Sequence, residues 1–556
     1  MRFETHAHSM YSNIRLVDCI NKPEDLIRKA AELGLAGITL TDHESLSGHV
    51  DWLNAEKKLK KDGVIPPDFV CALGNEIYLV DNRKAATKFW HFILIAKNKE
   101  GHRALRELSS TAWYNSFRYR GMERVPTTKD ELRAIVHKYP NTLIADSACL
   151  GSEVAHLTLE LIDLEKAKVK DEQIIYNKKL EIVNFCNFCK DLFGDDFHLE
   201  VAPSASKDQI KYNKRIKEIA RGLNIKLVFG GDSHYLTKKD RLVHKAFLNS
   251  KEGEREVDEF YSYAYLMNDE EAFENCAGVF TKEEFDEICH NSIEIMNKIE
   301  HYELDHSPII PETKVKYYAP IKDESLNKYP TLYFLRSEGT DNERYWVNQC
   351  LEGLIKINKK NDVIYIKRLE EEADIINTVG NNLGNDLFSY FNTFQSYIDL
   401  FWDCGSIVGP GRGSSVCYLS NYLLGITQLD PIEYNLPAFR FLNKERVELP
   451  DIDIDLSPSK RPLIFKKIRE RVGETNLLQV ATFTTVGPRS AVLTACRGYR
   501  SNDYPNGIDN DIAQYMASMI PSERGFTWPL KDMVYGNEEK GRKPNKAFIE
   551  EVSKYP

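Results

Sequence analysis

The stretch Val408-Gly-Pro-Gly-Arg-Gly-Ser-Ser415, with Pro450-Asp-Ile-Asp-Ile-Asp-Leu456 after it, decides how the second half of the chain folds. Three glycines and a proline within six residues cannot continue a helix or a central strand, so the first part predicts a loop. Such a loop exposes backbone N–H groups, and Arg412 adds a fork of donors. These are the groups that bind a phosphate.

The second part of the stretch predicts a β-strand with an acidic face. Side chains alternate along a strand, so Asp451, Asp453 and Asp455 share one face and three apolar residues share the other. Carboxylates two residues apart repel one another unless cations lie between them. A pair of divalent cations beside a phosphate-binding loop indicates phosphoryl or nucleotidyl transfer.

Composition is that of a soluble globular protein with three or more domains, since the chain has 556 residues. Its formal charge of −10 excludes a general polycation. One region has a positive net charge instead. Residues 440–500 hold 12 Lys and Arg against 7 Asp and Glu. The excess begins after the acidic strand with Lys460, Arg461, Lys466, Lys467 and Arg469. It is either a nucleic-acid surface or a solvated helix face.

The cysteines and the start of the chain predict a cytoplasmic protein with reduced thiols. The first residues, Met-Arg-Phe-Glu-Thr-His, contain no apolar signal core, and no run of 18 apolar residues could span a membrane. Cys186 and Cys189 form the one Cys-x-x-Cys pair, within a helical pattern. A zinc site needs four ligands, so buried packing cysteines are the favoured interpretation.

Metal-ligating residue types recur at the ends of predicted strands in the first 270 residues. His6 and His8 alternate, so on a strand both imidazoles face the same way. Further apolar runs, separated by amphipathic helical stretches, lie over 36–41, 69–76, 90–96, 143–149 and 226–234. Alternating strands and helices predict a barrel or a doubly wound sheet, and a barrel rim is a common place for an active site.

This series resembles the polymerase-and-histidinol-phosphatase (PHP) family, whose metal set includes His-x-His, Thr-Asp-His, Gly-x-Glu and Asp-x-His motifs. Carried over to this sequence, the resemblance implies the metal ligands His6, His8, Asp18, His43, Glu76, His91, Cys149, Asp232 and His234. Asp18 lies a few residues beyond the usual spacing, and Arg15 is nearer the expected place. The implied fold is a distorted (β/α)7 barrel holding two or three Zn²⁺ or Mn²⁺ ions, and the implied activity is a 3′→5′ exonuclease. The alternative is a domain kept for folding or docking.

The middle of the chain predicts helices and a linker. Helical patterns cover residues 280–302, 345–358 and 366–383, whereas Ser307–Tyr329 is rich in proline and has no clear period. Asn385–Trp402 is strongly aromatic. At near-helical spacing its rings indicate core packing rather than a surface for base stacking.

The opening stretch resembles the C-family DNA polymerases, the bacterial DNA polymerase III alpha subunits. The resemblance also rests on Leu-Gly-Ile-Thr-Gln-Leu-Asp-Pro (424–431), Arg-Phe-Leu-Asn-Lys-Glu-Arg-Val (440–447), Gln-Val-Ala-Thr-Phe-Thr-Thr-Val-Gly (479–487) and Arg-Ser-Ala-Val (489–492). It implies an α/β fold with a polymerase-beta-like nucleotidyltransferase palm, a mixed sheet with helices, and then a mainly helical thumb. With the PHP-like region in front, it covers essentially the whole chain.

The resemblance assigns a role to each group of residues. Asp451 and Asp453 would be catalytic and hold Mg²⁺, and Lys460, Arg461, Lys466, Lys467 and Arg469 would contact the DNA backbone. The incoming dNTP would be held by Gly411, Arg412, Gly413, Ser414 and Ser415. The expected domains are 1–270 (PHP), 271–330 (connection), 331–459 (palm, first part) and 460–556 (thumb).

One departure from the polymerase pattern indicates that the chain needs a separate partner. The family uses a third carboxylate on a later palm strand, and no later strand of this chain carries a matching acid. We therefore expect a split or truncated polymerase that binds template–primer DNA and dNTP and needs a separate part with fingers and the third Asp. Sliding clamp and replisome proteins would join through that part. The alternatives are a PHP phosphoesterase with a non-catalytic palm, or a replisome scaffold.

Overall fold

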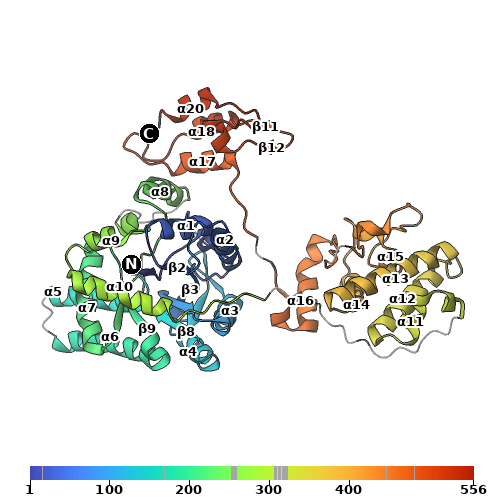
Figure 1. Ribbon diagram of the computed structural model, residues 1–556, viewed down its shortest axis with the longest axis horizontal. Helices are drawn as coiled ribbons and strands as arrows, with labels where there is room; N and C mark the ends of the chain where they lie inside the picture. The colour runs from blue at the N-terminus through green and yellow to red at the C-terminus, as the bar shows by residue number, and fades with distance from the viewer. Residues whose placement is uncertain are drawn as a thin grey trace. The chain divides into compact units, whose positions relative to one another are not determined.

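A computed structural model of the chain describes residues 1–555 apart from residues 16, 168–170, 252–258, 306–309, 311–314, 316–323, 446–447 and 481. The contacts divide the chain into two compact units, one formed by Met1–Leu304 with Phe483–Pro556 and one by Asp305–Thr482 (Figure 1). The four domain ranges expected from the sequence stay a prediction. Within the described residues, no helix is long and apolar enough to cross a membrane.

A single eight-stranded sheet forms the centre of the first unit. Its order is β1 (Phe3–Glu4), β2 (Gly37–Leu40), β3 (Val70–Val80), β4 (Trp90–Ala96), β8 (Leu143–Asp146), β9 (Phe197–Val201) and β10 (Lys226–Phe229), with β7 (Pro126–Thr128) paired to β3. Only β4 runs antiparallel to its neighbours. A parallel bridge between Ala7 and Ser233 joins the two ends of this order, so the sheet is a nearly closed barrel.

Helices surround this barrel, as the alternation of patterns predicted (Figure 1). They are α1 (Pro23–Glu32), α2 (His49–Lys61), α3 (Lys99–Tyr114), α4 (Lys129–Lys138), α5 (Glu153–Lys166), α6 (Glu172–Phe193), α7 (Lys207–Leu223), α8 (Arg241–Asn249), α9 (Asp269–Asn275) and α10 (Lys282–Met296). Pro23 begins α1, where its missing N–H costs nothing, and Thr128 caps α4 in a box with Glu131. The predicted strands and helices of this region are confirmed.

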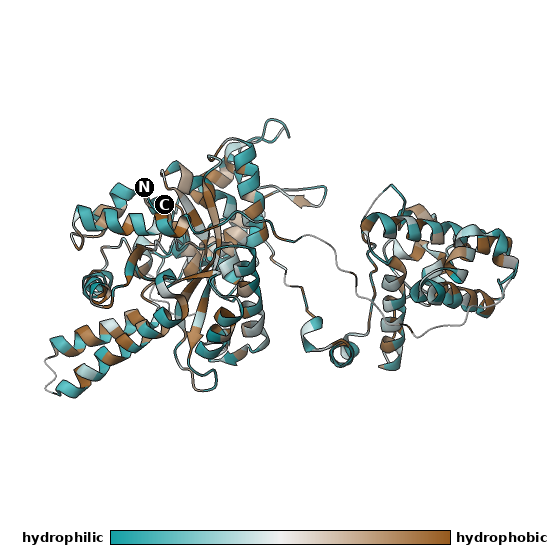
Figure 2. Cartoon of the chain, turned by 60° about the horizontal axis from the view of Figure 1, so that its bottom comes forward, coloured by the Kyte–Doolittle hydropathy of each residue, from teal (hydrophilic) through white to brown (hydrophobic). Residues whose placement is uncertain are grey.

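The barrel strands are apolar and the outer faces of the helices are hydrophilic (Figure 2). The largest core cluster packs side chains of β3, β4, β8, β9 and β10 against the helices. Cys186 and Cys189 lie in this core on α6, both fully buried, which confirms that they are packing cysteines. All cysteines of the chain are free thiols, as expected.

The second unit is helical. It contains α11 (Pro330–Ser337), α12 (Asp341–Lys356), α13 (Val363–Leu383), α14 (Leu387–Asp403), α15 (Leu419–Leu423) and α16 (Arg461–Val472). Phe388, Phe391 and Phe401 of α14 are buried in its core, so the aromatic stretch is core packing, as predicted. The predicted linker over Ser307–Tyr329 lies largely outside the described residues.

The mixed sheet expected for the palm is reduced, within the described part of residues 305–482, to one antiparallel bridge between Val408 and Leu456. Residues 451–455 form no strand. Their alternation is as predicted, since Ile452 is buried while Asp451 and Asp455 are exposed. An extended segment becomes a strand only when a neighbouring backbone pairs with it, and Val408 supplies just one such pair.

The last part of the chain returns to the first unit. It forms α17 (Pro488–Gly498), α18 (Asn510–Ser518), the hairpin β11 (Ser522–Glu523) and β12 (Phe526–Thr527), α19 (Leu530–Tyr535) and α20 (Lys546–Val552). Helix α17 packs against α8 so closely that a Cβ on Gly498 would lie 1.7 Å from the carbonyl oxygen of Ala246. Only glycine permits this approach.

Candidate metal centre and candidate phosphate-binding loop

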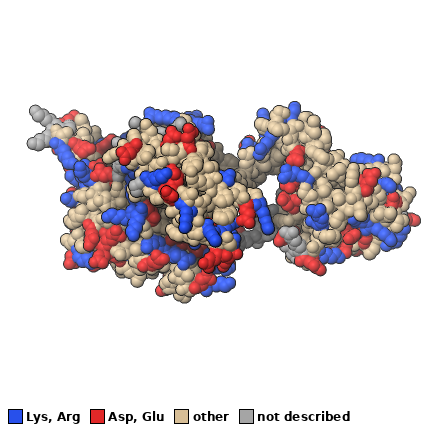
Figure 3. All heavy atoms as spheres, turned by 90° about the horizontal axis from the view of Figure 1, so that it is seen from above, with Lys and Arg blue, Asp and Glu red and all other residues tan. Residues whose placement is uncertain are grey.

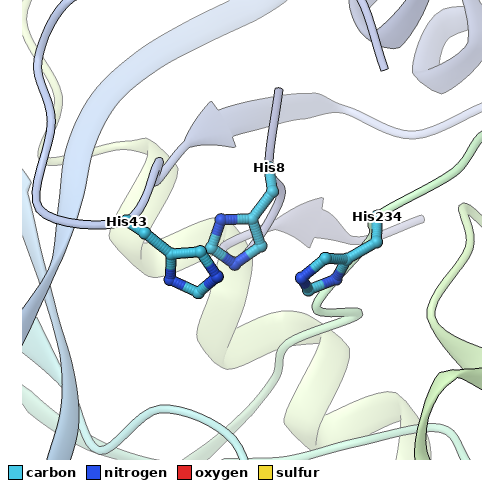
Figure 4. Close-up of side chains that lie close together, drawn as sticks. All are labelled: His8, His43 and His234. Atoms are coloured by element: carbon cyan, nitrogen blue, oxygen red, sulfur yellow. The ribbon is translucent and has the colours of Figure 1, made fainter. Parts of the chain in front are cut away.

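Histidines from three separate segments of the barrel point toward one another. His8 follows β1, His43 follows β2 and His234 follows β10, and their imidazoles converge in Figure 4. Each is buried, because the ends of neighbouring strands meet at one rim of the barrel. All nine residues proposed as ligands lie in or beside this cluster, and their role in metal binding stays a prediction.

His6 and His8 form the first metal-type group together with Asp232. The two Nε2 atoms lie 3.0 Å apart, and Asp232 Oδ1 lies 3.3 Å from that of His6 and 3.1 Å from that of His8. Asp232 has a φ of +45°, a conformation that a non-glycine residue adopts only when its surroundings hold it. The backbone after β10 is therefore shaped to bring this carboxylate to the histidines.

Asp18 joins the second group, which contains His8, His43 and His234. Its Oδ2 atom lies 2.7 Å from His43 Nε2 and 3.2 Å from His234 Nε2. Its other oxygen accepts a hydrogen bond of 2.8 Å from the hydroxyl of Tyr261. The structure thus places Asp18, rather than Arg15, in the cluster.

Glu76 connects the first two groups to a third. Its carboxylate lies 3.6 Å from both His6 Nε2 and His8 Nε2, 2.7 Å from His91 Nδ1, and against His43. Cys149 Sγ lies 3.6 Å from His91 Nδ1. His8, His43 and Glu76 each contact more than one group, which is the arrangement that a cluster of several metal ions requires.

The donor set fits divalent metal ions. His43 Nδ1, both oxygens of Glu76 and Oδ1 of Asp232 are buried and lie close to other donor atoms of the cluster, but none makes a well-oriented hydrogen bond, an arrangement that a bound cation would stabilise. Burial lowers the pKa of His8 to about 3, with a further contribution from His43, so His8 is neutral and able to coordinate. Burial would lower the pKa of His6 as well, but Glu200 and Asp232 outweigh it and raise that pKa well above its usual value. Imidazole, thiolate and carboxylate together suit Zn²⁺ or Mn²⁺.

Two buried carboxylates of this centre were missed by the sequence analysis. His6 Nδ1 donates to Glu200 at 2.9 Å, which fixes the ring so that Nε2 faces the cluster. Asp42 accepts hydrogen bonds from the backbone and hydroxyl of Ser9 and from the hydroxyl of Ser12. The signal for Glu200 was an acid at an inward position of the apolar run Phe197–Val201. The signal for Asp42 was its place directly before His43.

In the second unit, the glycine-rich loop lies beside the acidic segment, although 34 residues of the chain separate them. Gly409 donates its N–H to the carbonyl of Asp455 at 2.9 Å. Gly413 has a φ of +69°, and a Cβ there would lie 3.1 Å from Asp453 Oδ2. Arg412 Nε lies 3.6 Å from Asp453 Oδ2. The structure therefore brings together the predicted phosphate-binding donors and the predicted catalytic carboxylates.

A buried carboxylate, paired with a partly buried arginine, lies against the segment that follows this loop. Glu372 of α13 accepts hydrogen bonds of 2.7 and 2.8 Å from the N–H groups of Leu419 and Ser420 and one of 2.8 Å from Arg368 Nε. Burial raises the pKa of Glu372, whereas Arg368 and the two amides oppose that change. The carboxylate fixes the first turn of α15, which follows the loop directly. No sequence pattern distinguishes Glu372 from the charged residues around it.

The residues proposed to contact DNA lie on and just before α16. Ile464 and Ile468 are buried in the core of the second unit, whereas Arg461, Lys466 and Lys467 are exposed. Lys467 pairs with Glu470 at 2.7 Å. Basic and acidic side chains are otherwise interspersed over the molecular surface seen in Figure 3. Contact with DNA stays a prediction.

Comparison with known proteins finds two family matches in the chain, one in each half. Residues 4–204 match the PHP domain, and residues 344–555 match the bacterial DNA polymerase III alpha NTPase domain. The chain is 40% identical over 572 residues to the DNA-directed DNA polymerase of Bacillus phage SPbeta and to a protein of Bacillus subtilis named "Probable DNA polymerase YorL". It is 30% identical over 525 residues to the DNA polymerase III subunit alpha of Borreliella burgdorferi.

These alignments use 99%, 99% and 92% of this chain but only 43%, 43% and 40% of the relatives, so the chain spans about two fifths of their length. The matches identify a PHP domain followed by a bacterial DNA polymerase III alpha NTPase domain. Over nearly its whole length the chain is similar to part of the bacterial DNA polymerase III alpha subunits and of the phage DNA polymerase.

Proposed function

We propose that this chain is the PHP and palm portion of a DNA-directed DNA polymerase that adds dNTP to a primer 3′-OH. The contact of the glycine loop with the acidic segment carries this proposal, because phosphate donors and carboxylates must meet at the reacting phosphate. Mg²⁺ held by Asp451 and Asp453 would activate the 3′-hydroxyl and stabilise the pyrophosphate. The remaining part of the polymerase, with the fingers and a third carboxylate, completes the activity.

The chain's own residues would position the nucleotide. The N–H groups from Gly411 to Ser415 and the Arg412 guanidinium would bind the triphosphate. In the structure Arg412 faces Asp453 and Asp455, so a bound nucleotide would compete for this side chain. The exposed cations of α16 would hold phosphates of the template–primer in a way that does not depend on sequence.

Primer extension by the polymerase assembly that contains this chain tests the proposal. Asp451→Asn and Asp453→Asn should each abolish extension, whereas Asp403→Asn, an exposed acid at the end of α14, should not change it. Extension that persists in the doubly substituted Asp451→Asn/Asp453→Asn assembly would refute the role of these carboxylates. Sliding clamp and replisome proteins are proposed partners of the complete assembly.

A second activity, metal-dependent 3′→5′ hydrolysis at the PHP site, is favoured by the convergence of nine ligand-type side chains at one rim of the barrel. Zn²⁺ or Mn²⁺ bound there would polarise a phosphodiester and supply a hydroxide. Release of a 3′-terminal nucleotide from a labelled single strand should require metal and should be lost in His8→Ala. It should persist in His137→Ala, an exposed histidine on α4. A metal-free protein by elemental analysis would argue for a scaffold role instead.

A further inference from the structure

A loop and a hairpin rise beside the metal centre. Tyr78 of β3 pairs with His91 of β4, so the loop over residues 81–89 leaves the barrel from the end that carries His91. The hairpin of β5 (Phe117–Tyr119) and β6 (Met122–Arg124) packs on this loop through the Phe89 ring. The centre of that ring lies 6.3 Å from that of Phe117 and 6.1 Å from that of Tyr119, and the Arg124 guanidinium lies over it at 4.7 Å.

Arg15 ties the hairpin to the metal centre. Its Nη1 atom donates to the carbonyl oxygen of Glu123 at 2.9 Å, and its guanidinium lies 5.1 Å from the centre of the Tyr78 ring. Tyr78 in turn stacks on His91, with ring centres 4.7 Å apart. Arg15 also pairs with Glu44, the residue after His43. Two side chains, Arg15 and Tyr78, therefore connect the hairpin to the proposed metal ligand His91.

The outer surface of this pair of segments is basic and aromatic. We call it the ledge, and it consists of Lys84, Lys88, Phe89, Arg118, Tyr119 and Arg120. Arg118, Arg120 and Lys84 are exposed, and within the described part of the chain none of these three forms an ion pair. The Arg120 guanidinium lies over the Tyr119 ring at 5.3 Å. Free cations interleaved with rings are the combination that binds the phosphates and bases of a single strand.

We propose that the ledge binds single-stranded DNA and directs its 3′ end to the metal centre. What favours the ledge is its place, since its cations and rings lie beside a buried cluster whose substrate would be a phosphodiester. The direction of the strand rests on the proposed hydrolytic function, but binding of the strand does not. Anchoring by Arg15 keeps the hairpin fixed, so the ledge needs no closing movement.

Removal of two ledge cations in the full chain tests this proposal. Arg118→Ala/Arg120→Asn suits the hairpin, because Arg120 has a φ of +50° at the turn and asparagine tolerates this conformation. The background carries Lys466→Ala/Lys467→Ala, so that α16 does not mask the change. Binding of a fluorescent oligothymidylate is followed by anisotropy over a range of salt concentrations. Release of a 3′-label and hydrolysis of bis(p-nitrophenyl) phosphate are measured alongside.

We expect affinity for the oligothymidylate to fall about tenfold and the slope of log affinity against log salt to decrease by about 1.4, as for two single-strand phosphates. Hydrolysis of bis(p-nitrophenyl) phosphate, which is too small to reach the ledge, should not change. Tyr119→Leu should weaken binding several-fold without changing the slope, since a ring contact carries no charge. The control Lys214→Ala/Arg221→Ala removes the same charge from α7 and should leave binding unchanged.

The outcomes separate this proposal from the hydrolytic function. Unchanged binding in the ledge variant, or an equal loss in the α7 control, would overturn the ledge. Weaker binding combined with no hydrolysis of either substrate by any form of the protein would support the ledge and refute the hydrolytic function. Weaker binding with slower label release and normal hydrolysis of the small diester would support both.

Discussion

Asp18 Oδ2 lies 2.7 Å from His43 Nε2 and faces His234 as well, so one carboxylate oxygen serves two histidines from different strand ends. Burial would raise the pKa of Asp18, but His234 and His43 outweigh it and hold that pKa well below its usual range. The carboxylate is therefore ionised and lies where the predicted bridging ligand would be. Tyr261 holds its second oxygen and fixes its orientation.

Asp18→Asn should therefore lower the metal content of the purified protein. The amide keeps the size of the side chain but removes the negative charge that a cation needs. Elemental analysis after dialysis checks this, with Asp68→Asn, an exposed acid before β3, as the matched control. A metal content equal to wild type in Asp18→Asn would show that Asp18 is no ligand.

Glu200→Gln should weaken metal binding without removing a ligand. Glu200 orients His6 through the hydrogen bond at Nδ1, and such outer partners typically change metal affinity by about 10–100-fold. The side chain is held tightly, since a Cβ on Gly230 would lie 2.1 Å from Glu200 Oε2. Metal titration against a competing chelator measures the effect. Glu172→Gln, exposed on α6, should not change affinity, and an unchanged value for Glu200→Gln would contradict this role.

Chelation should lower the thermal stability of the first unit. The cluster buries the carboxylates of Asp18, Glu76 and Asp232 together with four histidines, and metal binding to the folded form stabilises it by about 2.7 kcal/mol at 100 times the dissociation constant. Calorimetry with EDTA and after readdition of Zn²⁺ or Mn²⁺ checks the change. A melting temperature that does not respond to chelator or metal would indicate that the cluster binds no metal.

The sequence was informative about the barrel because two signals agreed there. Apolar runs predicted the strands, and ligand-type residues at their ends predicted one shared rim. Asp18 was the least regular of these positions, yet the loop between β1 and α1 brings it to His43. The role of Glu200 could not be predicted from the sequence. Its function depends on contact with His6, which lies 194 residues away along the chain.

The acidic segment shows where sequence patterns fall short. Alternation correctly placed Ile452 inside and Asp451 outside, but it could not show whether another backbone pairs with the segment. Strand formation depends on that partner, and among the described residues of the second unit the pairing is limited to Val408 with Leu456. In the same way, the buried Glu372 lies in a charged helical run whose pattern does not distinguish it from its exposed neighbour Glu371.

Gly413→Ala should impair nucleotide incorporation beyond the effect of its backbone strain. A Cβ at Gly413 would lie 3.1 Å from Asp453 Oδ2, so the loop or the carboxylate must shift. Gly425→Ala is the matched control, because Gly425 has a similar φ of +73° but nothing lies within 4 Å of its added Cβ. Both substitutions cost about 1–2 kcal/mol of backbone strain. We expect a raised KM for dNTP in the assembled polymerase with Gly413→Ala only. Equal effects of the two variants would mean that strain, rather than contact with Asp453, is responsible.

Glu372→Ala should destabilise the second unit by about 2–4 kcal/mol, since it leaves two buried amides without their acceptor and removes the acceptor of Arg368 Nε. Protection against hydrogen exchange should be lost first at the N–H groups of Leu419 and Ser420. These are the first two residues of α15, which begins just after the phosphate-binding loop. Hydrogen exchange followed by mass spectrometry measures it, and exchange of the peptide over 419–423 should accelerate by orders of magnitude. Glu371→Ala, its exposed neighbour, should leave this exchange unchanged. If both variants behave alike, the buried carboxylate does not hold the loop in place, and the geometry around Gly413 must be maintained by other contacts.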